Sequence, residues 1–143
     1  MIKELVHDPI FLAQRSEPAD SSDEQTALDL LDTITAHKDS CVGMAANMIG
    51  VLKRIIVFAS DTDQRKNGAF EIMYNPVIIK CSGAFRTEEG CLSLLGDPRP
   101  VKRFKSIKVK FQNRDFEERF KTFTGFTAQI IQHEIDHCNG ILI

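Results

Sequence analysis

The sequence contains 143 residues, of which 43% are hydrophobic and 27% are charged, which is the balance of an ordinary globular protein. Its 18 basic and 20 acidic side chains give a net charge of −2. Proteins that bind nucleic acid or anionic membranes usually carry a clustered excess of lysine and arginine, so we expect no direct nucleic-acid binding and no membrane partner. For a chain of this length, one domain covering residues 1–143 is the expected organisation.

The first residues, MIKELVHDPIFL, contain no long apolar core before a small-residue cleavage site. No stretch of the sequence reaches the ~18 apolar residues that span a bilayer, and we therefore expect a cytoplasmic protein. In that compartment cysteines are expected to be free thiols or metal ligands rather than disulfides. The chain has four: Cys41, Cys81, Cys91 and Cys138.

The predicted elements begin with an amphipathic helix of about four turns that starts at Glu24. Apolar residues recur there at helical spacing, at positions 27, 28, 30, 31, 34 and 36. Residues 41–50, CVGMAANMIG, are small and apolar and include two glycines. This composition indicates a closely packed loop or strand in which the backbone approaches another part of the molecule.

Five β-branched or alternating runs follow, at residues 54–59, 70–74, 77–81, 101–104 and 107–111. Turn-forming residues separate them, at 61–68, Asn75-Pro76, Ser82-Gly83, 96–98 and 113–116. A second helix is predicted from Thr124 to about Asn139, with Gly140 at the position of a C-cap glycine. Few helices separate the strands, so we expect an α+β fold with mostly antiparallel β-sheets packed around the C-terminal helix, and with an N-terminal helix.

The predicted C-terminal helix contains the H-E-x-x-H pattern, from His133 to His137. Four residues advance a helix by about 400°, so the two imidazoles project from one face, one turn apart, and can share a metal ion. Glu134 lies near the same face, where it can deprotonate a water molecule. The alternative interpretation is a solvated charged patch with incidental histidines.

A catalytic metal site of this type needs a third protein ligand. The metzincin pattern, which places a third histidine six residues after the second, fails because that position is Ile143. The third ligand is therefore expected upstream of the helix. Candidates are Cys91, Cys41, Cys81, His7, His37, Glu88 and Glu89, among which Cys91 stands out because it follows a glycine in a short turn, TEEGCLS.

Three separated segments resemble those of the peptide deformylases. Residues 43–50, GMAANMIG, are similar to the G-Φ-G-Φ-A-A-x-Q segment, residues 89–93 are EGCLS, and residues 132–137 are QHEIDH, matching Q-H-E-x-D-H. The segments occur in the family's order, and two of the three match at every fixed position. With the helix–strands–helix layout, the resemblance covers almost the whole chain.

The resemblance implies that Cys91, His133 and His137 bind one divalent metal ion, with Glu134 as general acid and base. Fe²⁺ is the family's preferred ion in the cell, and Zn²⁺, Ni²⁺ or Co²⁺ can replace it. The implied function is a metal-dependent hydrolase that removes the N-formyl group from the N-terminal formylmethionine of nascent polypeptides. Its partners would be N-formylmethionyl peptides or nascent chains, in proximity to the ribosome. The backbone N–H of Leu92 and the motif glutamine would hold the charge of the tetrahedral oxygen.

The motif glutamine is replaced here by Met48, and the first glycine of that segment by Cys41. A thioether donates no hydrogen bond, and losing one oxyanion donor typically lowers the rate by ~10²–10³, so we expect reduced activity. Asn47 carries an amide, but a neighbour on an extended segment points to the opposite face.

A second departure is Gln129, which is polar where the family's methionine pocket is usually apolar. The residues expected to bind substrate are Val42, Gly43, Met48, Phe126, Gln129 and Ile130. Asp136 is expected to orient a ligand or to pair with Arg103, and a plain surface ion pair is the alternative. Glu89 and Gln132 are candidates for supporting the ligands, although polar residues beside a motif often serve only packing or solvation.

Three functions remain open at this point. The first is a peptide deformylase with impaired activity. The second is a deformylase-like protein that binds metal and N-terminal peptides without efficient turnover, which Met48 and Gln129 motivate. The third is an H-E-x-x-H peptidase or amidase that acts on another small acyl amide.

Overall fold

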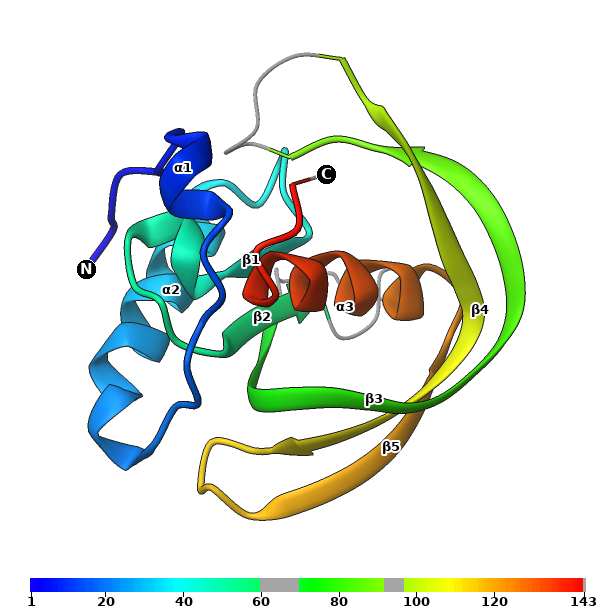
Figure 1. Ribbon diagram of the computed structural model, residues 1–143. Helices are drawn as coiled ribbons and strands as arrows, with labels where there is room; N and C mark the ends of the chain where they lie inside the picture. Colours follow the sequence, from blue (N-terminus) through cyan, green and yellow to red (C-terminus); the bar gives the residue numbers. More distant parts are fainter. Residues whose placement is uncertain (60–69, 92–96, 143) are drawn as a thin grey trace.

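The computed structural model describes residues 1–59, 70–91 and 97–142. Its helices are α1 (Pro9–Leu12), η1 (Ser21–Asp23), α2 (Glu24–Ala36), η2 (Ala46–Ile49) and α3 (Gly125–Cys138). Its strands are β1 (Gly43–Ala45), β2 (Ile55–Ala59), β3 (Phe70–Glu89), β4 (Arg99–Gln112) and β5 (Glu118–Thr124). The strands form one antiparallel sheet in the order β1-β2-β3-β4-β5, and the long strands β3 and β4 curve around α3 (Figure 1). The predicted α+β fold with an antiparallel sheet around the C-terminal helix is confirmed.

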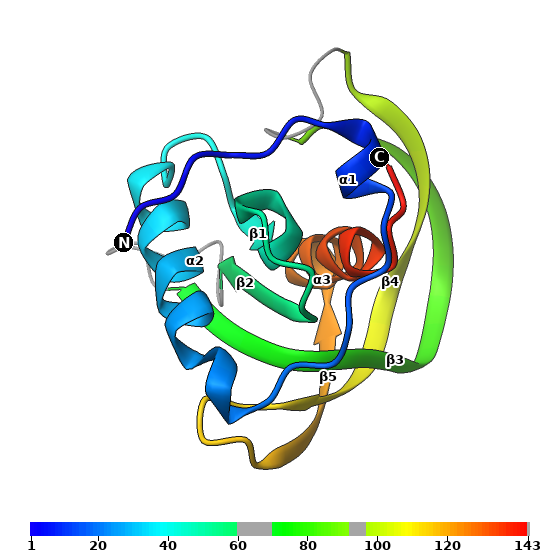
Figure 2. The ribbon, with the colours of Figure 1, turned by 60° about the vertical axis from the view of Figure 1, so that its left-hand side comes forward.

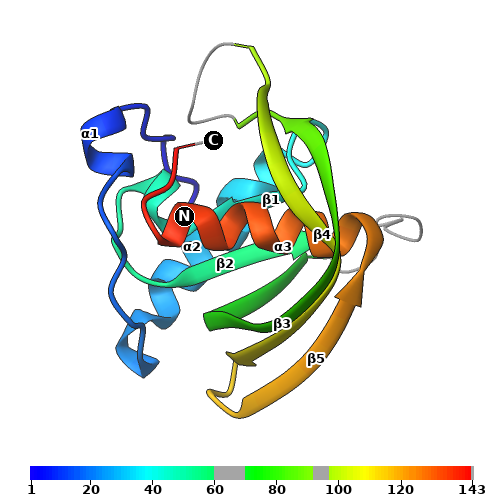
Figure 3. The same cartoon turned by 45° about the vertical axis from the view of Figure 1, so that its right-hand side comes forward.

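The short strand β2 lies between two helices, which explains why all five of its residues are buried. Ile55 and Val57 pack in a cluster with α2, whereas Ile56 and Phe58 pack in a second cluster with α3. Successive side chains of a strand point to opposite faces, so a continuous apolar run is what a strand covered on both faces requires. Figure 3 shows the same layering, with α3 in front of β1 and β2 and with α2 behind them.

The predicted breaks at Asn75-Pro76 and Ser82-Gly83 are wrong, because β3 runs through both without ending. The pairing of β3 with β4 shifts its register between Tyr74 and Val77 and again between Ile78 and Lys80. The turn-forming residues thus introduce bulges and bends rather than turns: φ is 51° at Asn75 and 76° at Gly83. The resulting curvature carries the end of β3 over to α3.

Two further differences concern β4 and β5. The runs 101–104 and 107–111 were expected as separate strands, but both belong to β4. The turn at 113–116 is confirmed: the side chain of Asn113 accepts hydrogen bonds from the backbone N–H groups of Asp115 and Glu117, each at 3.0 Å. Strand β5 was missed because its sequence, ERFKTFT, buries only Phe123 and shows no clear apolar alternation. The predicted turn at 61–68 lies outside the described residues.

Helix α3 ends near where the sequence predicts, and Gly140 adopts a positive φ of 74°. The chain around Ala13 passes so close that a Cβ at Gly140 would lie 2.8 Å or less from two of its backbone atoms. The backbone N–H of Ser16 donates to the carbonyl of Cys138 at 2.8 Å, and Figure 2 shows the chain after α1 beside this end of α3. Within the described ranges, none of the helices is long and apolar enough to cross a membrane.

Candidate metal centre

Helix α3 brings His133 and His137 together on its buried face. Their side chains are one helical turn apart, and the two Nε2 atoms lie 2.9 Å from each other. The rings meet edge to face, with centroids 4.6 Å apart. Both residues are buried, and their Nε2 atoms face each other.

Cys91, directly after the Glu89–Gly90 end of β3, reaches the same point. The sulfur of Cys91 and the ring nitrogens of His133 and His137 lie within 4.8 Å of one another. A thiolate and two imidazoles are donors that transition metals such as iron, cobalt, nickel and zinc accept. The donor set therefore fits a divalent metal ion.

The other candidates do not join this group of ligand atoms: Glu88 lies on the cavity wall but outside the group, Glu89 contacts His133 instead, and the rest lie elsewhere or have other partners. Cys41 lies on the wall of the same cavity, but its Sγ donates to the carbonyl of Gly43 at 2.9 Å. Cys81 is exposed on β3, and His7 is exposed near the start of the chain. His37 has its Nδ1 within 2.9 Å of the Thr33 carbonyl at the end of α2.

Glu89 holds the first histidine in place. Its Oε1 lies 2.8 Å from Nδ1 of His133, which places a proton on Nδ1 and leaves the Nε2 lone pair for a metal. The side chain of Arg103 donates to both oxygens of Glu89 at 2.7–3.1 Å and to Asp136 at 2.6 Å. The predicted pairing of Asp136 with Arg103 is confirmed, and Arg103 is only 4% exposed, so the pair is not a surface ion pair.

The pKa of Glu89 reflects these contacts. Burial by itself raises it, but the hydrogen bonds from His133, Arg103 and Gln129 outweigh burial and lower the pKa to about 2. Glu89 is therefore a carboxylate at all physiological pH values. A permanent negative charge beside Nδ1 makes the imidazole of His133 a stronger metal ligand.

The two histidines differ in their affinity for protons. Burial lowers the pKa of His137 to about 3, so this ring is neutral and able to bind a metal. Burial also lowers the pKa of His133, but hydrogen bonds to Cys91 and Glu89 raise it to about 10. A metal ion at this centre therefore competes with a proton for His133.

Glu134 lies beside the histidines and is buried, with 3% of its surface exposed. Burial raises its pKa to about 7, which suits a group that must both accept and return a proton near neutral pH. Its Oε1 has no hydrogen-bond partner within the described residues. The free oxygen leaves Glu134 available to a water molecule or a substrate.

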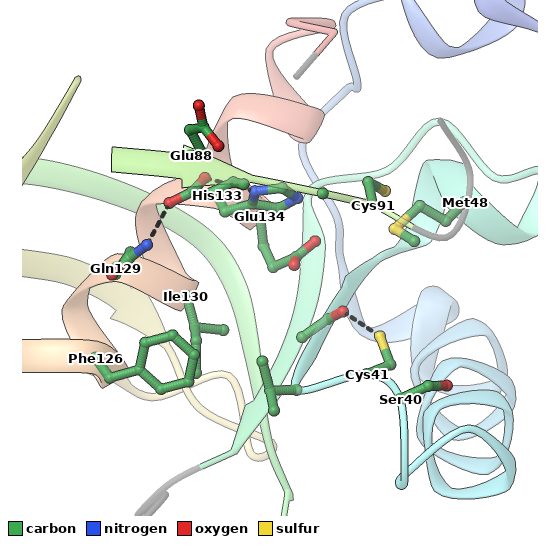
Figure 4. A pocket seen from close by; sticks show the side chains of 14 residues that line it. Ser40, Cys41, Met48, Glu88, Cys91, Phe126, Gln129, Ile130, His133 and Glu134 are labelled. Atoms are coloured by element: carbon green, nitrogen blue, oxygen red, sulfur yellow. Dashed lines mark hydrogen bonds and ion pairs between the residues drawn. The ribbon is translucent and has the colours of Figure 1, made fainter. Parts of the chain in front are cut away.

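A cavity of about 460 Å³ opens onto these groups (Figure 4). It is lined by Ser40, Cys41, Val42, Gly43, Met48, Glu88, Glu89, Gly90, Cys91, Phe126, Gln129, Ile130, His133 and Glu134. All six residues that the sequence analysis expected to bind substrate lie on its wall. Met48 and Cys91 lie at one end of the view, and Phe126 and Gln129 lie at the other (Figure 4).

Gly43 lies directly against Glu134 and Ile130 in this cavity. A Cβ at this position would lie 2.6 Å from Ile130 and 2.7 Å from Oε2 of Glu134. The sequence signal for this was the run of small residues at 41–50, which indicates a close backbone approach. Only glycine leaves the glutamate carboxylate where the structure places it.

Met48 is buried, and its sulfur accepts a weak hydrogen bond from the backbone N–H of Ala45 at 3.5 Å. It brings no N–H donor to the cavity. The amide of Asn47 does not replace it, because its Nδ2 donates to the backbone carbonyl of His137 at 3.0 Å and the residue does not line the cavity. Leu92, the other expected donor, lies outside the described residues.

Two supporting contacts were not foreseen in detail. The side chain of Gln132 accepts from the backbone N–H of Phe104 at 2.9 Å and donates to its carbonyl at 2.8 Å, which ties α3 to β4. Gln129 donates from Nε2 to Oε2 of Glu89 at 2.9 Å. Sequence reasoning identified Gln132 and Glu89 only as candidates, because their partners lie on other elements, 14 to 44 residues away in the sequence.

Comparisons with known proteins give one consistent result. The family model for polypeptide deformylase matches residues 2–143. A peptide deformylase of Clostridium beijerinckii is 48% identical over 143 residues, which is the full length of both chains. Among solved structures, a peptide deformylase from Legionella pneumophila is 33% identical with a TM-score of 0.86, covering 99% of this chain and 83% of that one. A class I type b peptide deformylase from Acinetobacter baumannii, solved with Met-Ala-Ser bound, is 30% identical with a TM-score of 0.85, covering 99% and 96%.

Proposed function

The chain belongs to the polypeptide deformylase family, and we propose that the cavity beside Cys91, His133 and His137 is its active site. The protein is a metal-dependent hydrolase that removes the N-formyl group from N-terminal formylmethionine of nascent polypeptides. The site assignment rests on one observation: three ligand atoms lie within 4.8 Å of one another beside the buried carboxyl of Glu134. Residues 1–143 act as one catalytic domain, because α2 and α3 both pack on β2.

The three ligands are Cys91, His133 and His137, and Fe²⁺ is the ion that they hold in the cell. Zn²⁺, Ni²⁺ and Co²⁺ can replace it, because Cys-His-His sites accept several divalent ions and their occupancy follows availability. When bound, the ion supplies Lewis acidity that activates water and polarises a carbonyl group. Elemental analysis of protein purified without oxygen tests the iron assignment, and a preparation that contains only zinc would contradict it.

Glu134 moves the proton. Its carboxylate takes a proton from the attacking water and returns it to the nitrogen of the leaving amine, so that formate and a free N-terminus are released. A pKa of about 7 lets the same group perform both transfers without a large energetic penalty in either direction. Gly43 keeps the backbone close to this carboxylate and leaves no space for a competing side chain.

The formylated first residue lies along α3, with its formyl group near Glu134 and its side chain between Val42, Phe126 and Ile130. These residues supply apolar walls to the cavity, which suits a methionine side chain. Nascent chains at the ribosome, in the cytoplasm, are the natural source of such substrates. The reported Met-Ala-Ser complex of the Acinetobacter protein supports a tripeptide as the test substrate.

Met48 lowers the rate. The oxyanion lacks a side-chain donor at position 48, which costs ~10²–10³ in kcat. This observation also favours a second candidate function, a protein that binds metal and N-terminal peptides without efficient turnover. Mass spectrometry of the recovered formyl-Met-Ala-Ser separates the two: deformylated product supports the enzyme, and tight binding of an unchanged peptide supports the binding protein.

The experiment for the proposed function measures formate release from formyl-Met-Ala-Ser by iron- or nickel-loaded protein under anaerobic conditions. We expect wild type to release formate, Met48→Gln to be faster by ~10²-fold, and Glu134→Ala to be inactive. Thr122, exposed on β5 and remote from the cavity, provides a control in Thr122→Ala, which leaves the rate unchanged. Wild-type activity that survives Glu134→Ala would contradict the assigned role.

A further inference from the structure

Gln129 presents an anchored amide on the cavity wall, beside Glu89 and next to the apolar side chains of Phe126 and Ile130. It lies on α3 between Phe126 and Ile130, and its Nε2 donates to Glu89 at 2.9 Å (Figure 4). A glutamine amide has two N–H groups and one carbonyl. Among the described residues, Glu89 is its only hydrogen-bond partner, so one N–H and the carbonyl remain available to a molecule in the cavity.

The Gln129 amide lies on the part of the wall that the thioether sulfur of the substrate is expected to reach. Gln129 precedes His133 by four residues, which places it about 6 Å from His133 along the helix axis. The formyl carbon and the thioether sulfur of formylmethionine are separated by five bonds of roughly 1.5 Å, which span about 6 Å when extended. With the formyl group near Glu134, the extended side chain of the first residue runs along the wall that Phe126, Gln129 and Ile130 share, which brings its sulfur atom within reach of the Gln129 amide.

A thioether sulfur makes little use of an amide, because it is only a weak acceptor. Oxidation of methionine to its sulfoxide places a strongly accepting oxygen on the same atom. On a fully apolar wall this oxygen would be buried without a partner, which makes binding unfavourable. The free N–H of Gln129 can donate to it, and Glu89 holds the amide in place for that bond.

We propose that this enzyme also deformylates polypeptides whose first residue is N-formylmethionine sulfoxide, an inference that rests on the proposed function. The reaction is the same hydrolysis: water adds its oxygen to the formyl carbon, the C–N bond breaks, and the amine leaves with a proton. Formate and a peptide with N-terminal methionine sulfoxide are the products, and the sulfoxide itself is unchanged. Gln129 is the residue that determines this specificity.

The test compares formyl-Met(O)-Ala-Ser, with each sulfoxide epimer assayed separately, against formyl-norleucine-Ala-Ser, whose side chain has the length of methionine but carries neither the sulfur nor the sulfoxide oxygen. The measured quantity is the ratio of the two kcat/KM values in wild type and in Gln129→Met, which keeps the length of the side chain and removes the amide. We expect the ratio for the better epimer to fall by about 10-fold in Gln129→Met, the size of a lost neutral hydrogen bond with a buried acceptor. Taking a ratio cancels any common loss of rate that arises because Glu89 loses a partner.

Thr127→Leu is the matched control, because Thr127 lies on the same helix and does not line the cavity. This control is expected to leave the ratio unchanged. An equal ratio in wild type and Gln129→Met would overturn the inference, even if both proteins deformylate formyl-norleucine well. If neither substrate is turned over, the proposed function fails, and the dissociation constants of Met(O)-Ala-Ser and norleucine-Ala-Ser still test the inference: the same 10-fold change supports it, and no change refutes it.

Discussion

The buried ion pair of Arg103 offers the sharpest test of the forces that support the metal ligands. Arg103 is 4% exposed and contacts Glu89, whose side chain is 8% exposed, at 2.7 Å. It also contacts Asp136, whose side chain is 24% exposed, at 2.6 Å. Arg103→Met keeps most of the side-chain volume and removes the charge. Within the described part of the chain, Glu89 then remains buried as a carboxylate with only His133 and Gln129 as partners.

Removing one member of a buried ion pair typically costs about 3–5 kcal/mol, because the remaining charge is left without compensation. For a protein of this size, each kcal/mol lowers Tm by about 3 °C, so we expect a decrease of about 9–15 °C. The matched control is Lys110→Met, which breaks a pair with Glu118 whose side chains are 49% and 56% exposed. Exposed pairs contribute at most about 1 kcal/mol, so the control should lose less than about 3 °C.

The assay is thermal and urea unfolding followed by circular dichroism, with all variants in the same metal-loaded state, because bound metal stabilises the folded state. The reasoning would be refuted if Arg103→Met lost no more stability than Lys110→Met. A decrease below about 1 kcal/mol would mean that solvent reaches Glu89 and that burial does not control its charge.

Three other predictions concern the same region. Gly43→Ala should lower kcat by about 10²-fold, because the new Cβ displaces the carboxylate of Glu134. The loss in the free energy of unfolding should be smaller than the increase in the activation free energy; formate release and unfolding measured together check this, and equal free-energy losses would contradict it. Iodoacetamide at pH 8 should modify the exposed Cys81, leave Cys138 unmodified because burial raises its pKa to about 12, and reach Cys91 only after chelation of the metal, as peptide mass mapping would show. The lowered pKa of Glu89, about 2 against an ordinary 4.5, contributes stability that is complete above pH 4.5 and is lost as pH falls toward 2; urea midpoints that do not change between pH 5 and pH 3 would contradict this.

Local pattern and spacing predicted those parts of the fold that depend on neighbouring residues. The helical period after Glu24, the H-E-x-x-H spacing and the C-cap glycine at Gly140 are all local, and the structure contains each of them. The breaks in β3 were predicted wrongly because that prediction also used only local composition. Asn75 and Gly83 have the composition of turns, and only their cross-strand pairing turns them into a bulge and a bend.

The environment of the metal centre could be predicted only in part. The four-residue spacing predicts that His133 and His137 lie together. The position of Cys91 beside them depends on the curvature of β3, which the sequence pattern did not reveal. The contacts of Glu89 with Arg103 and of Asn47 with the His137 carbonyl join residues 14 and 90 positions apart. Such contacts are set by packing, so the sequence nominated Glu89 and Asn47 without their partners, although it did pair Asp136 with Arg103.

The central claim is that Cys91 completes a metal centre that drives formate release. The most direct measurement determines metal content and formate release on the same anaerobic preparations of wild type, Cys91→Ser and Cys81→Ser. Cys81 is the matched control, because it is an exposed thiol on β3, the strand that leads to Cys91, and does not line the cavity. We predict one metal ion per chain and formate release for wild type and Cys81→Ser, and loss of both for Cys91→Ser. Full metal content and undiminished formate release in Cys91→Ser would contradict the account.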